Sequence, residues 1–268
     1  EARLLSQLSN PNITRLIDSG QDGDWHYLAL EFVDGIDLKH WLASRHEPLS
    51  EHSALQLIAE IARGLMDAHE LGIIHRDIKP ENVLLGYRRK SAVARPSLEL
   101  DDYFVKLTDF GIARSLEQSA SLEMTRQGSL LGTPLFMAPE QFKGSTELTP
   151  ATDVYALGVT LFVLLAGRPP FVSDDPMKLA AMHCFDLPPD IQKLNPLVSA
   201  ETVGLLARML LKDAAHRPAD AGQILVEIEQ KLRGESHSAE LHPRIPSQQN
   251  KQVWERTFTW DLESSPAQ

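Results

Sequence analysis

The stretch HRDIKPENVLL, residues 75–85, places charged and amide side chains on a short segment that then turns apolar. It contains Asp77, Lys79 and Asn82, and a second acid, Asp109, follows a strand-like run in KLTDFG. Phosphoryl transfer from a nucleotide needs hard oxygen ligands for a divalent metal ion, a carboxylate that orients the attacking hydroxyl, and cations for the developing charge. These residues offer that set, so the sequence predicts a site for a nucleotide and a metal ion.

The composition favours a globular protein with a sizeable core, because 43% of the 268 residues are hydrophobic. The formal net charge of −11 argues against nucleic acid or an anionic membrane as the main partner. The single cysteine, Cys184, excludes a disulfide within the chain and favours a reducing compartment. The longest apolar run, residues 154–167, is too short to span a bilayer and predicts a buried helix.

Apolar periodicity and turn residues predict an order of elements along the chain. Ser50, Ser199 and Asp220 are candidate N-caps of helices, and the composition after Arg233 predicts a linker. The predicted ranges are a helix at 2–8, hairpin strands at 13–18 and 25–33, helices at 38–43 and from Ser50 to Gly72, strands at 83–85 and 105–107, and helices at 152–166, 176–183, 200–211 and 220–232.

Three motifs in order carry a resemblance to a known family. HRDIKPEN is followed by DFG at 109–111 and by APE at 138–140. Together they resemble the catalytic core of a eukaryotic-like (Hanks-type) serine/threonine protein kinase, and runs such as DFGIAR and LLAGRPPF are similar to bacterial members. The resemblance extends from residue 1 to about residue 232.

The resemblance implies an α+β, protein-kinase-like two-lobe fold, with a partial small lobe (a helix plus a hairpin) and a mainly helical large lobe. Residues 1–33 would be a remnant of the small lobe with the hinge at its end, and 34–233 the large lobe. An insertion at 86–104 would replace the tight turn that the family usually has there. Residues 234–268 would form a linker or tail.

The resemblance also implies a role for each residue of the catalytic motifs. Asp77 resembles the base that accepts the proton of the substrate hydroxyl. Lys79 looks like the loop lysine that steadies the γ-phosphate, as in serine/threonine rather than tyrosine kinases. Asn82 and Asp109 resemble the two ligands of Mg²⁺. Thr133 resembles the residue that contacts Asp77 and Lys79.

A second group of residues is implied to bind the nucleotide base and ribose. The segment LALEFVDG resembles the strand and hinge that hold adenine, with Leu30 at the gatekeeper position. Glu31 and Val33 would offer backbone groups to the purine, and Leu84 would form the floor of the pocket. Asp37 fits a contact to the ribose and fits equally a solvated acid at the start of a helix.

Four further residues resemble structural positions of the family. His75 resembles a residue that supports the DFG turn and is not a base. Asp153 looks like the acid that braces the catalytic loop from the core helix. Glu140 and Arg217 resemble the buried ion pair that ties the activation segment to the large lobe.

Regulation by phosphorylation is implied by Arg76 and Arg114, which resemble residues of kinases that are switched on in this way. A phosphate would bring about −1.5 to −2 charges and bridge both guanidinium groups. We favour Thr125 over Ser129 as the acceptor, with self-association of the chain for this modification. The implied partners are ATP, Mg²⁺ and proteins with Ser or Thr, in the cytoplasm, with a membrane anchor outside this chain left open.

The sequence departs from the family at its beginning. Neither G-x-G-x-x-G nor V-A-I-K occurs, and Glu1 aligns with the helix glutamate, a regulatory position, that pairs with the lysine of the second motif. We therefore expect a truncated catalytic domain of low activity by itself. A pseudokinase scaffold is one alternative, although Asp77, Asn82 and Asp109 are all present. A small-molecule kinase of similar fold is another, and GTPLFMAPE at 132–140 argues against it.

Overall fold

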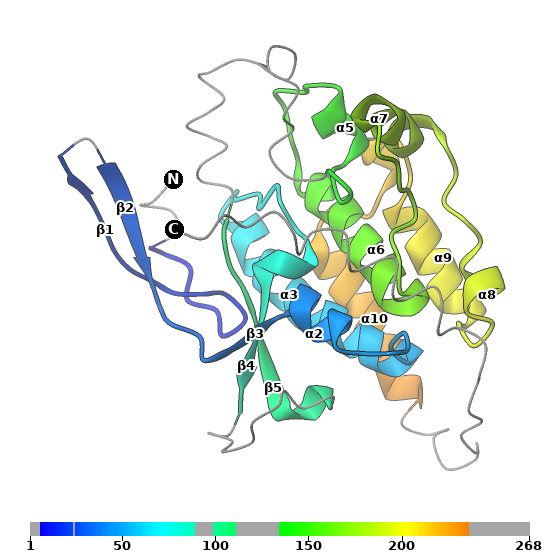
Figure 1. Cartoon of the computed structure of the whole chain (residues 1–268), viewed down its shortest axis with the longest axis horizontal. Helices are drawn as coiled ribbons and strands as arrows, with labels where there is room; N and C mark the ends of the chain where they lie inside the picture. The colour runs from blue at the N-terminus through cyan, green and yellow to red at the C-terminus, as the bar shows by residue number, and fades with distance from the viewer. Residues whose placement is uncertain (1–5, 24, 89–98, 111–133, 236–268) are drawn as a thin grey trace.

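The computed structural model describes residues 6–23, 25–88, 99–110 and 134–235. They form a two-stranded hairpin, a three-stranded sheet and a group of packed helices (Figure 1). The elements run in this order: β1 (Leu16–Asp22), β2 (Trp25–Leu30), β3 (Gly35–Asp37), α2 (Leu38–Ala43), α3 (Glu51–Glu70), η1 (Pro80–Asn82), β4 (Val83–Tyr87), η2 (Leu100–Asp102), β5 (Tyr103–Leu107), α5 (Pro139–Phe142), α6 (Pro150–Ala166), α7 (Pro176–Phe185), α8 (Ile191–Leu194), α9 (Ala200–Met209), η3 (Ala214–His216) and α10 (Ala221–Glu235).

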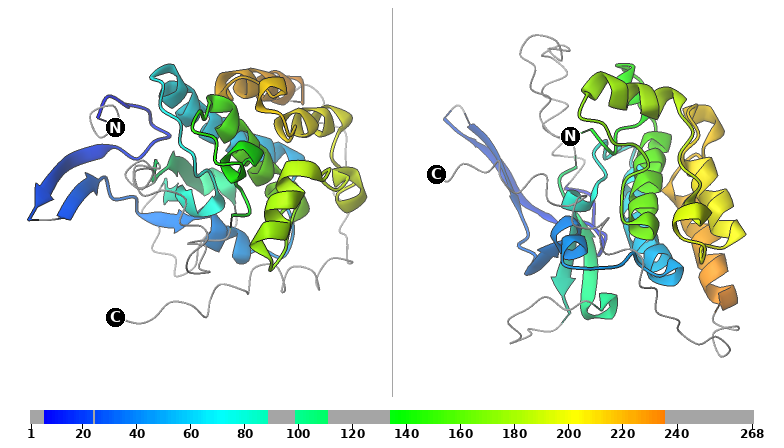
Figure 2. Two further views of the ribbon diagram at one scale, coloured as in Figure 1. Left: turned by 90° about the horizontal axis from the view of Figure 1, so that it is seen from above. Right: turned by 45° about the vertical axis from the view of Figure 1, so that its right-hand side comes forward.

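The predicted hairpin is confirmed as antiparallel strands β1 and β2, and it stands away from the helices in both views of Figure 2. Its first strand begins at Leu16 and not at residue 13, because Ile13 instead forms an isolated parallel bridge with Leu107 of β5. Several large apolar side chains of the hairpin and the segment after it are exposed to solvent, among them Ile17, Trp25 and Phe32.

The three-stranded sheet is antiparallel in the order β3-β4-β5. Strands β4 and β5 are longer than the predicted 83–85 and 105–107, since Tyr87 pairs with Tyr103 and their rings lie 5.4 Å apart. The connection between them therefore spans 88–102 and is shorter than the predicted insertion at 86–104. The division of the chain into lobes stays a prediction.

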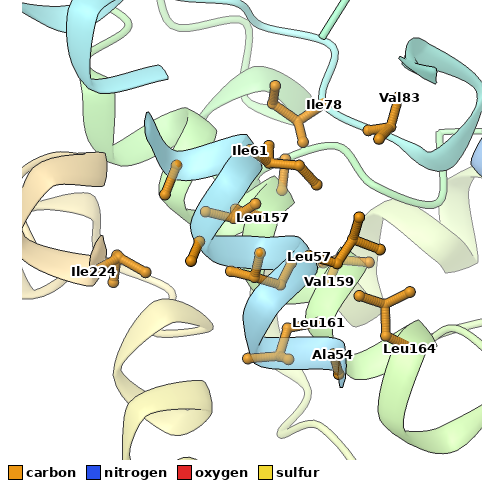
Figure 3. Packing of buried hydrophobic residues seen from close by; sticks show 14 of the residues in the cluster. Ala54, Leu57, Ile61, Ile78, Val83, Leu157, Val159, Leu161, Leu164 and Ile224 are labelled. Atoms are coloured by element: carbon orange, nitrogen blue, oxygen red, sulfur yellow. The ribbon is translucent and has the colours of Figure 1, made fainter. Parts of the chain in front are cut away.

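Helix α6 forms the centre of the helical part and is buried from Ala151 to Leu165. Helix α3 packs between α6 and α10, and Figure 3 shows side chains of these helices meeting in one core. Each fully buried aliphatic side chain in this core contributes about 1.5–3 kcal/mol relative to an exposed one. The sequence prediction of a buried helix at this place is confirmed.

The predicted helix starts are confirmed by their caps. The side chains of Ser50, Ser199 and Asp220 accept the backbone N–H groups of Ser53 (3.1 Å), Thr202 (3.3 Å) and Gln223 (3.0 Å).

Some predicted element boundaries do not match the structure. Of the helix predicted at 2–8, residues 2–5 lie outside the described ranges and residues 6–8 are not helical. Helices α5 and α8 were not predicted, since each is only four residues long. Within the described ranges, none of the helices has the length and apolar composition that crossing a bilayer requires.

Candidate active site

The segment that carries Asp77 is attached to the core helix through one buried carboxylate. Asp153, near the start of α6, is completely buried. Its oxygens accept the backbone N–H groups of His75 and Arg76, each at 2.8 Å, and contact Nε2 of His69 at 2.9 Å. A buried carboxylate requires such partners, because an unpaired charge in the core is strongly unfavourable. Asp153 therefore braces this segment, in the place that the resemblance implied.

His75 supports the turn that leads to Asp109 and is held as a neutral ring. Its Nε2 lies 2.8 Å from the carbonyl oxygen of Thr108, and Nδ1 accepts the N–H of Asp77 at 3.3 Å. The ring stacks on Phe110 with centroids 4.5 Å apart. Burial lowers the pKa of His75 below its ordinary value, although the nearby charge of Asp153 opposes this. The structural role that was predicted for His75 agrees with these contacts.

The side chains of Lys79 and Asn82 both contact the carboxylate of Asp77. Lys79 Nζ lies 2.8 Å from Asp77 Oδ2. Asn82 Nδ2 donates to the carbonyl oxygen of Asp77 at 2.7 Å and lies 3.2 Å from Oδ2. The nitrogen of the Asn82 amide is thus engaged by Asp77, and its oxygen accepts no hydrogen bond from the residues that the structure describes.

The buried neighbours of these polar residues explain why they stay in place. Ile78 and Val83 alternate with the polar side chains and are fully buried. Both extend into the core near Ile61 of α3 (Figure 3). The N–H of Thr108, the residue before Asp109, donates to the carbonyl oxygen of Asn82 at 2.9 Å. Apolar anchoring and one backbone hydrogen bond therefore join the segment that leads to Asp109 to Asn82.

Two residues of the site have a left-handed backbone. Arg76 has φ of 69° and Asp109 has φ of 57°, and they are the non-glycine residues with positive φ in the described ranges. Such conformations cost of order 1–3 kcal/mol and persist where surrounding contacts impose them. Sequence reasoning gave no sign of either.

The structure places the predicted nucleotide-binding residues on the hairpin and the sheet. Asp37 of β3 lies directly opposite Leu84 of β4. The carboxylate of Asp37 accepts the N–H of His40 at 2.9 Å and caps α2, as the helix-start interpretation expected. Leu30 ends β2, opposite Leu16 of β1. A contact of Asp37 with ribose stays a prediction.

Both the backbone and the side chain of Glu31 are held by contacts within the protein. Its N–H donates to the carbonyl oxygen of Arg15 at 2.9 Å, so of its backbone groups the carbonyl is the one left for a purine. Its carboxylate pairs with Lys106 and accepts the N–H of Arg15 at 2.9 Å. Burial alone would raise the pKa of Glu31, but these partners outweigh it and lower the pKa. Val33 follows in the segment between β2 and β3 and is half-buried.

A buried ion pair fastens α5 to the helical part of the molecule. Both terminal nitrogens of Arg217 lie 2.8 Å from the carboxylate oxygens of Glu140. Arg217 also donates to the carbonyl of Ala151 at 2.9 Å, and Thr152 donates to Glu140 at 2.9 Å. Burial opposes ionisation of Glu140, yet the Arg217 guanidinium lowers its pKa below the ordinary value. The pair that the resemblance implied is present.

Comparison with known proteins decides the family. The family model described as "Protein kinase domain" matches residues 1–228. The chain belongs to the protein kinase family. The kinase is 37% identical to serine/threonine-protein kinase pkn3 of Myxococcus xanthus over 233 residues, which is 85% of this chain and 40% of that protein. It is 33% identical over 228 residues to PrkC of Bacillus subtilis, covering 85% of this chain and 32% of the relative.

Solved structures agree with the fold. The kinase domain of Mycobacterium tuberculosis PknI matches with a TM-score of 0.63 and 26% identity, over 85% of this chain and 75% of the other. Rad53 matches with a TM-score of 0.63 at 24% identity, over 84% of this chain and 52% of the other, which bears on the fold alone. The α+β protein-kinase-like fold is thereby confirmed. The kinase spans 40% of the length of pkn3 and 32% of the length of PrkC.

The donor set of the kinase fits Mg²⁺. An amide oxygen and a carboxylate, from Asn82 and Asp109, are the hard oxygen ligands that this ion prefers, and Mg²⁺ commonly takes few protein ligands beside nucleotide phosphates. These residues would hold the ion, which neutralises charge on the phosphates when bound.

Several predicted residues of the kinase lie outside the described ranges, namely Glu1, Arg114, Thr125, Ser129 and Thr133. The structure also shows residues that sequence reasoning missed. His69 contacts Asp153, and its place on the buried side of the helix pattern was a usable signal. Gln141 donates a hydrogen bond to the carbonyl oxygen of Arg76, and nothing in the sequence indicated this contact.

Proposed function

We propose that this kinase transfers the γ-phosphoryl group of ATP, in the presence of Mg²⁺, to Ser and Thr hydroxyls of proteins. The observation that carries the proposal is the group Asp77, Lys79 and Asn82, held on Asp153 with Asp109 alongside. The similarity to bacterial proteins that are named serine/threonine-protein kinases supports the same reaction.

Each residue takes one part in this reaction. The carboxylate of Asp77 orients the substrate hydroxyl and accepts its proton as the oxygen attacks the γ-phosphorus and the bond from that phosphorus to the leaving ADP oxygen breaks. Lys79, 2.8 Å from that carboxylate, places a positive charge near the oxygens of the γ-phosphoryl group, over which the charge is spread in the transition state. The Asn82 amide keeps Asp77 from rotating, because it contacts both the carbonyl and the carboxylate of that residue.

Substitution of the two aspartates tests the proposal. Asp77→Asn should lower the transfer rate by about 10²–10⁴, the usual contribution of a general base, and leave ATP affinity nearly unchanged. Asp109→Asn should weaken Mg²⁺-dependent binding of ATP as well. The measurements are γ-phosphate transfer to a generic basic protein and ATP affinity with and without Mg²⁺. Asp174→Asn, in an exposed loop, is the matched control. Equal loss of ATP binding in both variants would contradict the assigned roles.

Regulation by phosphorylation belongs to the same proposal. Arg76 lies directly before Asp77 and has its Nε buried without a hydrogen-bond partner in the described ranges. A phosphate on Thr125, or on Ser129, would pair with Arg76 and Arg114 and so link the acceptor to the catalytic loop. Self-association would bring one chain's acceptor to another's site. Mass spectrometry after incubation with ATP, followed by assay of Thr125→Ala and Ser129→Ala, decides between the two acceptors.

Two further features complete the proposal. The 268 residues contain neither G-x-G-x-x-G nor V-A-I-K, both of which stabilise nucleotide phosphates in this family, so this chain by itself should transfer slowly. A cytoplasmic reaction suits a chain whose single cysteine, Cys184, is free. Fractionation of cells that carry a tagged protein tests the second feature.

A further inference from the structure

Gln141 joins the APE motif to the catalytic loop through both ends of its side chain. Its Oε1 accepts the N–H of Ala138 at 2.9 Å, and its Nε2 donates to the carbonyl oxygen of Arg76 at 2.8 Å. Because one partner is a donor and the other an acceptor, the orientation of the amide is fixed. Gln141 is thus a bridge between segments 65 residues apart in the sequence.

The peptide group that Gln141 contacts is the one that leads into Asp77. Its carbonyl belongs to Arg76 and is held by Gln141, while its N–H belongs to Asp77 and is held by Nδ1 of His75 at 3.3 Å. The preceding N–H, of Arg76, is held by Asp153 at 2.8 Å. Arg76 has φ of 69°, so these contacts impose a backbone that a non-glycine residue rarely adopts.

Helix α5 does not depend on Gln141 to stay in place. Glu140 is held there by Arg217 at 2.8 Å through both carboxylate oxygens, and Thr152 donates to it at 2.9 Å. Removal of the Gln141 amide should therefore release the Arg76 carbonyl and leave α5 docked. A merely structural role for Gln141 would predict the opposite, namely loosening of α5 with no particular effect on the Arg76–Asp77 peptide.

We infer that Gln141 is a positioning residue for the base Asp77, and that through it the APE motif at 138–140 fixes the catalytic loop. This inference rests on the proposed function for its effect on phosphoryl transfer. Its effect on the backbone of Arg76 and Asp77 is independent of that function.

Gln141→Met tests the inference, because methionine has a similar length and makes neither hydrogen bond. Gln192→Met is the matched control, since Gln192 Nε2 donates to the carbonyl of Val198 at 2.9 Å far from the loop. Amide hydrogen exchange, followed by NMR without substrate, should be faster at Arg76 and Asp77 in Gln141→Met alone. The transfer rate should fall about 10- to 100-fold, as for misplacement of a catalytic group, with KM for ATP within about twofold.

Gln141→Glu separates the two hydrogen bonds and serves if the methionine variant does not fold. Glutamate keeps an acceptor for Ala138 but has no donor for the Arg76 carbonyl, so it should show the same faster exchange and the same loss of rate. Unchanged exchange at Arg76 and Asp77, or equal effects of Gln141→Met and Gln192→Met, would overturn the inference. If a longer version that includes a Gly-rich loop and a strand lysine transfers no phosphate at all, the proposed function fails, and the exchange result still decides the role of Gln141.

Discussion

His183 is a buried ionisable residue that the site does not use. Its ring lies among Phe142, Tyr155 and Phe171, with centroids 5.4, 5.8 and 5.0 Å away. The hydroxyl of Tyr155 lies 3.0 Å from its Nδ1 and, since burial raises the pKa of Tyr155, it stays protonated and donates. Burial, with the nearby charge of Lys212, lowers the pKa of His183 to about 3.

This buried histidine should make the fold sensitive to acid. The unfolded chain binds a proton at His183 below about pH 6.5, and the folded chain does not until about pH 3. The contribution of His183 to the free energy of unfolding is therefore largest above about pH 6.5 and decreases as the pH falls toward 3. At pH 5 the loss is about 2 kcal/mol. Urea unfolding at pH 7.5 and pH 5 gives the decrease in the free energy of unfolding between the two pH values. This decrease should be about 2 kcal/mol smaller in His183→Gln than in the unsubstituted chain.

A matched substitution separates His183 from the other groups that titrate in this range. His46 is exposed, so His46→Gln should leave the pH dependence of the unfolding free energy as it is in the unsubstituted chain. If His183→Gln and the unsubstituted chain lose equal stability between the two pH values, the buried histidine is not the cause.

At the scale of residues, sequence motifs predicted roles for Asp77, Asn82 and Asp109 because their chemistry is carried by residue type and short spacing, and these roles stay predictions. The left-handed backbone of Arg76 and the hydrogen bond from Gln141 were not predicted, since both arise from contacts between segments that are distant in the sequence. Asp37 shows a third case, in which the sequence left two roles open and the structure shows the one at the helix start.

Among elements, the attachment of α5 depends on the buried pair of Glu140 and Arg217. Arg217→Gln should lower the free energy of unfolding by about 3–5 kcal/mol, because it leaves the largely buried Glu140 carboxylate without its ion-pair partner. Arg208→Gln is the control, since Arg208 and Glu227 pair while half-exposed and should contribute about 1 kcal/mol or less. Denaturant unfolding of both variants gives the comparison. Similar losses in the two would contradict a special role for the buried pair.

The connection between β4 and β5 should be dispensable for activity. The N–H of Arg88 donates to the carbonyl of Asp102 at 2.9 Å, so the ends of the connection are already adjacent. Replacement of residues 89–98 by a short glycine-containing turn should keep phosphoryl transfer and stability close to their original values. Transfer rate and unfolding midpoint are the measurements. A large fall in rate at unchanged stability would mean that the connection takes part in function.

The extension of β4 and β5 also shows why element boundaries were hard to predict. The predicted strand ended at Leu85, directly before Gly86. In the structure a Cβ at Gly86 would lie 2.2 Å from the ring of Phe104, so this glycine allows an aromatic side chain to cover the strand. Sequence alone cannot show which residue lies across the sheet.

For the molecule as a whole, the α+β fold was predictable because three motifs that resemble a known family occur in order, and because helix α6 is long and apolar. The position of the hairpin, with its apolar side chains exposed, was not predictable, since the pattern of a strand does not show what the strand lies against.

The whole chain offers the broadest test of the nucleotide site. The 268 residues should transfer phosphate about 10²–10³ more slowly than a longer version that includes a Gly-rich loop and a strand lysine, since loss of one electrostatic contact has an effect of this size. Radiolabelled γ-phosphate transfer by both proteins at equal concentration measures the ratio. Robust turnover by the 268 residues alone would show that those parts are not needed.

The packing of α3 between α6 and α10 has a consequence for synthesis of the protein. About 150 residues separate the end of α3 from the start of α10, so the ribosome has released α3 long before its partner exists. At translation rates of about 5–20 residues per second, this interval is about 8–30 s. During it one apolar side of α3 remains without its final cover, and the nascent chain is open to capture by chaperones.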